Sequence, residues 1–130
     1  MKYLNQDNSK NNNYSLKIFD FFYLNGNLYI ITELLGESFY QKFIKTKKLL
    51  TISQVRKYTT DLLKNLKFLK DMNIIHCDLK PENIVLNDKK NIAKIIDYGS
   101  ACFIDDIGEF YIQTRTYRAP EVIMGLPYNQ

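Results

Sequence analysis

The fold of this chain is decided by the stretch His76-Cys77-Asp78-Leu79-Lys80-Pro81-Glu82-Asn83. It places a carboxylate, an ammonium group and a carboxamide within a few residues of one another. A carboxylate in such a loop can take the proton of a hydroxyl, a lysine can neutralise a transferred phosphate, and an amide oxygen can hold a magnesium ion. The stretch therefore points to phosphoryl transfer, with Asp78, Lys80 and Asn83 as the candidate residues.

Two further motifs follow along the chain. Residues 95–99 form an apolar run that ends in Asp97-Tyr98-Gly99, and residues 117–121 read Tyr-Arg-Ala-Pro-Glu. A glycine gives the backbone the freedom to stop a strand abruptly, so that the carboxylate of Asp97 can face a metal. A lone His-x-Asp is more often a hydrogen-bonded structural pair, but the three motifs in this order resemble the catalytic core of a protein kinase.

Composition restricts the class of protein. With 130 residues, of which 45% are hydrophobic, the chain can form one modest core, which excludes a disordered or fibrous protein. No run approaches the ~20 apolar residues that a membrane helix needs, so we expect no membrane partner. The net charge of +4 comes from scattered lysines, which favours a solvated surface over nucleic-acid binding.

Residues 1–15 form an Asn-rich polar leader. It contains no apolar core of the kind that a secretory signal carries, which predicts a cytoplasmic or nuclear protein. Cys77 and Cys102 show no metal-ligand spacing, and intracellular thiols are normally reduced. We therefore expect both to be free thiols.

Local patterns predict the elements before the 76–83 stretch. Asn25-Gly26 is a strong hairpin signal, because a type I′ turn needs positive φ at both central residues, and it should join strands over residues 16–23 and 28–32. A short helix is expected over residues 37–45. One side of that helix should carry Phe39, Tyr40, Phe43 and Ile44.

A long helix should follow, beginning at a capping box formed by Thr51 and Gln54 and running to about Met72. Its buried stripe should contain Val55, Tyr58, Leu62, Leu66 and Leu69, which recur at steps of three and four. Residues 84–86 and 92–96 should then be short strands joined by a turn. These elements together predict an α+β fold.

Details narrow the resemblance to one kinase family. Cys77 replaces the usual arginine of the His-x-Asp motif, residues 99–102 read Gly-Ser-Ala-Cys, and residues 111–115 read Tyr-Ile-Gln-Thr-Arg. Together these resemble the dual-specificity tyrosine-regulated kinases (DYRK), including the Yak-type branch, in the CMGC group. The homeodomain-interacting kinases are the runner-up, suggested by Gly-Leu-Pro at 125–127. The resemblance implies the end of a small lobe, a hinge and the first half of a mainly helical large lobe.

The resemblance also implies roles for single residues. Asp78 is the expected catalytic base, Lys80 the phosphate-neutralising lysine, and Asn83 and Asp97 the ligands of Mg2+. A lysine two residues after the base is also the pattern of serine/threonine-directed kinases. ATP is the implied phosphate donor, and the implied substrates are proteins. The resemblance also assigns the residues around the adenine of ATP. Backbone groups of Glu33 and Leu35 would hydrogen-bond the adenine, Thr32 would be the gatekeeper, and the apolar Val85 would lie beneath the ring.

Tyr111 lies where these families phosphorylate their own activation loop. Phosphate there adds nearly two negative charges, which arginines grip bidentately. The family pattern assigns this role to Arg115 and Arg118, which also shape the pocket for the residue after the target hydroxyl, often a proline.

Some parts of a kinase are not found in these 130 residues. They hold no Gly-rich loop, no strand lysine with its helix glutamate partner and no C-terminal large-lobe helices, so residues 16–130 are expected to be an incomplete kinase domain. We expect an ATP-dependent serine/threonine kinase of dual specificity, represented by a truncated catalytic domain with little activity of its own. The alternative is a non-catalytic, kinase-like remnant that binds a protein partner.

Overall fold

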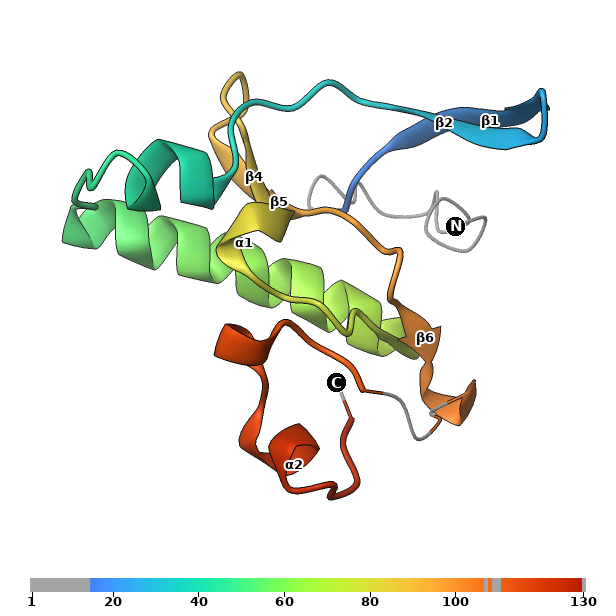
Figure 1. Ribbon diagram of the computed structural model, residues 1–130. Helices are drawn as coiled ribbons and strands as arrows, with labels where there is room; N and C mark the ends of the chain where they lie inside the picture. The colour runs from blue at the N-terminus through green and yellow to red at the C-terminus, as the bar shows by residue number, and fades with distance from the viewer. Residues whose placement is uncertain (1–14, 107, 109–110, 130) are drawn as a thin grey trace.

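The computed structural model describes residues 15–106, 108 and 111–129, so most of the Asn-rich leader lies outside the described residues. Helix α1 (Ile52–Asp71) runs across the middle of the view in Figure 1. The strands form three antiparallel pairs, and the predicted α+β class is confirmed. The pairs are β1 (Ile18–Leu24) with β2 (Asn27–Thr32), β3 (Ile74–Ile75) with β6 (Cys102–Phe103), and β4 (Ile84–Asn87) with β5 (Ile92–Ile95).

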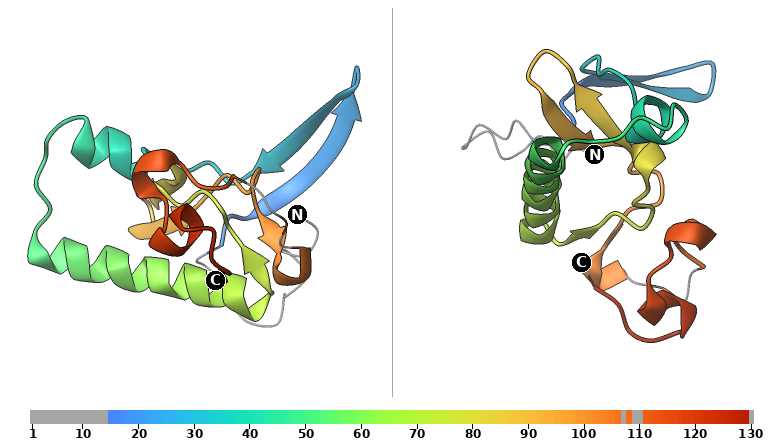
Figure 2. Two further views of the ribbon diagram at one scale, coloured as in Figure 1. Left: turned by 60° about the horizontal axis from the view of Figure 1, so that its bottom comes forward. Right: turned by 90° about the vertical axis from the view of Figure 1, so that its left-hand side faces the viewer.

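The β1–β2 hairpin projects away from the rest of the chain, as the views in Figures 1 and 2 agree. Its turn is the predicted one, because Asn25 and Gly26 both have positive φ, at 50° and 76°. Across the strands Phe22 pairs with Tyr29, and their rings stack at a centroid distance of 5.2 Å. Both strands begin and end within two residues of the predicted positions.

The short helix predicted over residues 37–45 is smaller than expected. It is a π-helical turn, η2 (Tyr40–Ile44), whose Phe43 joins the core while Phe39 packs against that core. Tyr40 and Ile44, which the prediction placed on the same side as these two rings, are 38% and 48% exposed, so that side is buried only in part. The turn is too short to bury a continuous apolar face.

Helix α1 begins as predicted. The Thr51 side chain accepts from the backbone N–H of Gln54, and the Gln54 side chain accepts from the backbone N–H of Thr51, which completes the capping box. The predicted stripe is only partly correct, because Val55 is 43% exposed. The deeply buried positions of the helix include two polar residues that the apolar pattern could not reveal, Asp61 and Asn65.

Asp61 and Asn65 attach α1 to strand β5. The carboxylate of Asp61 accepts from the backbone N–H of Ala93 at 3.1 Å, and Asn65 donates to the Ala93 carbonyl at 3.2 Å. Asn65 also accepts from the N–H of Ile95 at 3.4 Å. These bonds satisfy backbone groups on the edge of a two-stranded sheet, where unpaired groups would be costly to bury. They fix the β4–β5 pair over the middle of the helix.

The C-terminal segment lies beside the 76–83 loop, the segment that connects β3 to β4 and contains the turn η3 (Pro81–Asn83) (Figures 1 and 2). The backbone N–H of Gln113 donates to the carbonyl of Cys77 at 3.0 Å, which joins the two segments. The remaining short elements are η4 (Ile104–Asp106), η5 (Arg115–Tyr117) and α2 (Pro120–Ile123). In the part of the chain that the structure describes, no helix has the length and apolar character to cross a membrane.

Candidate active site

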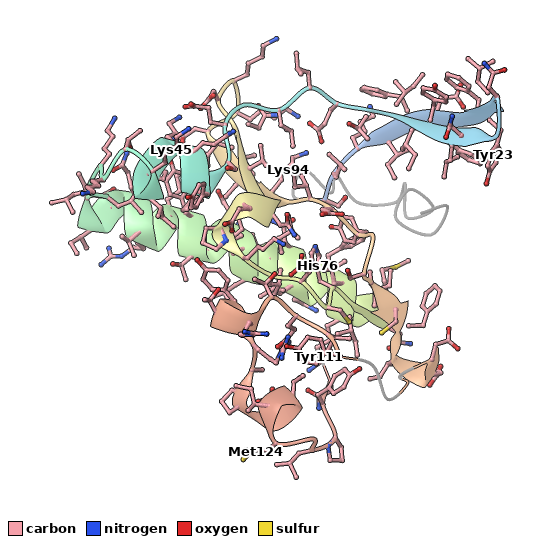
Figure 3. All side chains as sticks on the ribbon, in the orientation of Figure 1. Tyr23, Lys45, His76, Lys94, Tyr111 and Met124 are labelled. Atoms are coloured by element: carbon pink, nitrogen blue, oxygen red, sulfur yellow. The ribbon has the colours of Figure 1, made fainter. Side chains whose placement is uncertain are left out.

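His76 fixes the course of the 76–83 loop. Its Nδ1 accepts from the backbone N–H of Asp78 at 3.2 Å, and its Nε2 lies 2.9 Å from the carbonyl oxygen of Ile96. Since Nδ1 is an acceptor, the proton lies on Nε2 and the ring is neutral. Burial lowers the pKa of His76 and so favours the same neutral form. The imidazole therefore joins the loop to the residue that follows β5, near the middle of Figure 3.

The carboxylate of Asp78 lies at the centre of a polar cluster. Its Oδ2 accepts from Nζ of Lys80 at 2.6 Å and from Nδ2 of Asn83 at 3.2 Å. Its Oδ1 accepts from the hydroxyl of Thr114 at 2.6 Å. Burial raises the pKa of Asp78, but the bonds from Lys80 and Thr114 outweigh burial and hold it below its usual value. Asp78 is therefore ionised at neutral pH, in the form that can accept a proton.

Thr114 is a site residue that the sequence reasoning did not single out. Its hydroxyl lies 3.2 Å from Nζ of Lys80 as well as 2.6 Å from Asp78, and its backbone N–H donates to the same Oδ1 at 3.2 Å. The only signal in the sequence was its place inside the 111–115 motif, directly before Arg115. No local pattern connects that motif with residue 78.

Asn83 and Asp97 lie at neighbouring points of the site. The backbone N–H of Ile96, which precedes Asp97, donates to the carbonyl of Asn83 at 2.9 Å. The Nδ2 of Asn83 donates to Asp78, which leaves its amide oxygen directed away from that carboxylate. Asp97 is solvent-exposed and has a φ of 62°, and its Oδ1 accepts from the N–H of Gly99 at 3.3 Å. A carboxylate and an amide oxygen are donors that fit Mg2+.

The segment after β2 contains the residues assigned to adenine binding. The backbone N–H of Glu33 donates to the carbonyl of Lys17 at 3.0 Å, and the carbonyl of Glu33 accepts from the hydroxyl of Thr32 at 3.2 Å, which leaves that carbonyl one lone pair for a ligand. Among the described residues, the backbone groups of Leu35 have no hydrogen-bond partner. Val85 lies in β4, next to this segment, because Ser38 forms a β-bridge with it. The structure thus brings these three residues together.

Tyr111, Arg115 and Arg118 also lie close together. The Cζ atom of Arg118 lies 3.7 Å from the centroid of the Tyr111 ring, and 77% of the tyrosine surface is exposed. Arg118 and then Arg115 lower the pKa of the Tyr111 hydroxyl. Two carbonyls, those of Ile112 and Gln113, accept from the Arg118 guanidinium at 2.9 and 2.8 Å. The exposed phenol therefore faces a fixed positive charge.

The two cysteines are free thiols, as expected, and they are neighbours. The Sγ of Cys77 lies 3.6 Å from the Sγ of Cys102. Burial raises the pKa of Cys77 to about 12, and the contact with Cys102 acts in the same direction. Cys77 has a φ of 62°, so the loop turns sharply immediately before Asp78.

Comparison with known proteins now identifies the fold. The protein kinase domain family matches residues 4–130. The chain belongs to the protein kinase family. Two relatives of this kinase chain are the "Dual specificity protein kinase YAK1" of Saccharomyces cerevisiae, 43% identical over 92% of the chain and 15% of the relative, and the human "Dual specificity tyrosine-phosphorylation-regulated kinase 4", 44% identical over 92% and 24%.

A "Dual specificity protein kinase YAK1 homolog" of Arabidopsis thaliana is 44% identical over 89% of the chain and 12% of its own length. The predicted resemblance to DYRK and Yak-type kinases is thereby confirmed. The chain spans between 12% and 24% of the length of these relatives. Protein kinases generally use ATP with a divalent metal, so the family implies these cofactors.

Proposed function

We propose that this kinase chain forms the centre of a catalytic domain that transfers the γ-phosphoryl group of ATP to serine and threonine hydroxyls of proteins. Asp78 takes the proton of the hydroxyl, and Lys80 neutralises the transferred phosphate. The observation that carries the proposal is the Asp78 carboxylate, which has Lys80 on one oxygen and Thr114 on the other. These contacts keep the base charged and hold it in one orientation.

Asn83 and Asp97 would hold Mg2+, which neutralises charge on the phosphate oxygens when it is bound. Backbone groups of Glu33 and Leu35 bind the adenine, and Val85 supplies the apolar surface beneath it. The proposal is supported by the closeness of these groups. Asn83 donates a hydrogen bond to Asp78, and strand β4, which contains Val85, begins directly after Asn83.

We further propose that this kinase is of dual specificity and phosphorylates its own Tyr111. The exposed phenol lies over Arg118, and Arg115 lies close enough to lower its pKa, so a phosphate there would meet two guanidinium groups. The same arginines shape the site for the residue after the target hydroxyl, and we expect proline to be preferred there. The printed names of the relatives support dual specificity.

The test uses the full-length product of the gene that carries these residues, with labelled ATP and peptides that contain Ser-Pro or Thr-Pro. We expect phosphorylation that Asp78→Asn and Asp97→Asn each lower by at least ~10²-fold, because each removes a preorganised charge. Asp105→Asn, an exposed aspartate on η4, is the matched control and should retain wild-type activity. Equal activity in all four proteins would contradict the assignment.

A second candidate function is a non-catalytic module that binds a protein partner. It is favoured by the β1–β2 hairpin, on which Phe19 and Tyr23 are 58% and 72% exposed. We propose that the purified 130-residue chain alone has no detectable activity. A full-length product that neither binds ATP nor phosphorylates any peptide would support the binding module. Phosphorylation by the short chain that Asp97→Asn abolishes would contradict its inactivity.

A further inference from the structure

The most deeply buried ion pair among the described residues joins Glu33 to Lys94. Only 3% of the Lys94 side chain and 15% of the Glu33 side chain are exposed. Lys94 lies on β5, whereas Glu33 directly follows β2, so the contact joins segments that are 61 residues apart in sequence. Lys94 is labelled in Figure 3, between the β4–β5 pair and the start of the β1–β2 hairpin.

Both charged groups have further partners. Nζ of Lys94 also donates to the carbonyl of Ser15 at 2.9 Å. One Glu33 oxygen accepts from the backbone N–H of Lys17 at 2.9 Å, and the other accepts from Nδ2 of Asn87 at 3.4 Å. Burial raises the pKa of Glu33, but Lys94 and the N–H of Lys17 lower it more, so the carboxylate stays charged. One ion pair thus connects the residues before β1, the end of β2 and the β4–β5 turn.

A buried ion pair of this kind is a weak source of stability. Removing two charged groups from water costs about as much free energy as their attraction returns, and apolar replacements are often neutral or stabilising. What the pair does supply is a defined geometry, because the lysine and the carboxylate can satisfy each other in few arrangements. The effect to look for is therefore the position of the connected backbone.

The backbone connected by this pair is the segment assigned to adenine binding. At its start, Glu33 is held by Lys94 and by hydrogen bonds with Lys17. At its end, the N–H of Gly36 donates to the carbonyl of Leu86 at 2.8 Å. Between these points Leu34 is 97% exposed, so side-chain burial does little to fix the position of the segment. The ion pair determines the start of the segment, and β4 determines its end.

We propose that Glu33 and Lys94 are a positioning pair that sets the backbone of residues 33–35 for nucleotide binding, an inference that rests on the proposed kinase function. Neither side chain needs to touch the nucleotide. Their effect passes through the backbone of residues 33–35, so loss of the pair should weaken ATP binding and change the chemical step little.

The test compares variants of the full-length product. Lys94→Met alone would leave a buried carboxylate without its cation and could unfold the protein, so the main variant is the double substitution Glu33→Gln with Lys94→Met, which removes both charges. The charge-reversed protein, Glu33→Lys with Lys94→Glu, tests rescue. Lys89→Met, on the exposed β4–β5 turn, is the matched control.

We expect the neutral double variant to fold with a similar melting temperature but to raise the KM for ATP and the Kd for a fluorescent ATP analogue by roughly 10-fold, with kcat changed less than about 2-fold. The charge-reversed variant should recover part of the affinity, and Lys89→Met should match wild type. Unchanged KM and Kd in the neutral variant, or a change in kcat alone, would overturn the positioning role and leave the kinase function intact. A wild-type product that binds no ATP would overturn the proposed function and this inference with it.

Discussion

The hydroxyl of Thr114 donates to Oδ1 of Asp78 at 2.6 Å, while Lys80 occupies the other oxygen of the same carboxylate. The two residues are 36 positions apart in the chain. The backbone bond from Gln113 to Cys77 brings them together, so the contact depends on the path of the C-terminal segment. The orientation of the candidate base is thereby coupled to the segment that contains Tyr111 and Arg115.

Replacing Thr114 should therefore lower activity without unfolding the protein. Thr114→Val keeps the shape but removes the hydroxyl, so the carboxylate of Asp78 keeps its bonds from Lys80, Asn83 and the backbone N–H of residue 114 and loses the shortest bond to Oδ1. We expect kcat of the full-length product to fall by ~10- to 100-fold. Thr114→Ser, which keeps the hydroxyl, should retain most of the activity. Steady-state kinetics on a peptide substrate measures kcat of both variants. Equal rates in Thr114→Val and wild type would show that the contact is dispensable.

His76 should make stability depend on pH near neutrality. Burial in the folded chain holds its pKa below the ordinary histidine value of 6.5, so the unfolded chain binds more protons as the pH falls through that value. The free energy of unfolding should therefore be highest above about pH 6.5 and decrease as the pH drops below it. Denaturant unfolding at a series of pH values measures how steeply the free energy of unfolding changes with pH. His76→Gln should make this dependence weaker.

The chain contains one histidine, so its NMR titration can be assigned without ambiguity. A midpoint at or above the ordinary histidine value of 6.5 would contradict the neutral ring of His76. The pKa values of the Asp78 and Glu33 carboxyls are also lowered, from ordinary values of 3.8 and 4.5 that already lie below that of histidine. Their contribution to the free energy of unfolding is therefore lost at more acidic pH and does not overlap with the titration of His76.

Asn65 should be important for stability although it is polar. Only 1% of the Asn65 surface is exposed. Asn65→Ala would remove the side-chain oxygen that accepts from the N–H of Ile95 and the amide group that donates to the carbonyl of Ala93. We expect a loss of roughly 2 to 3 kcal/mol in the free energy of unfolding. Thr59→Ala, an exposed position on the same helix, should change it by less than about 0.5 kcal/mol. Urea unfolding of both variants provides the comparison.

Tyr111 should carry phosphate in the expressed full-length product. Mass spectrometry should find the modification in wild type and not in Asp97→Asn, which lacks the proposed metal ligand. Tyr111→Phe should lower activity by at least ~10-fold, because the phosphate can no longer bind Arg115 and Arg118. An unmodified Tyr111 together with full activity of Tyr111→Phe would contradict the proposed activation by phosphorylation of Tyr111.

Local signals in the sequence predicted much of the fold. The positive φ of Asn25 and Gly26 and the capping box of Thr51 and Gln54 depend on residues within a few positions of each other, so short patterns predicted them correctly. The apolar period failed at Val55, which is exposed, because the period says which side of a helix is apolar and not how far other segments cover it.

The family and the order of the motifs could be predicted from the residues alone, since Asp78, Lys80, Asn83 and Asp97 stand in segments whose residue types and spacing are recognisable. Which distant groups meet could be seen only in the folded chain. Thr114 reaches Asp78, Asn65 binds the edge of β5, and Lys94 pairs with Glu33 across 61 positions. Polar contacts of this kind leave no periodic signal, because they depend on where the chain returns in space.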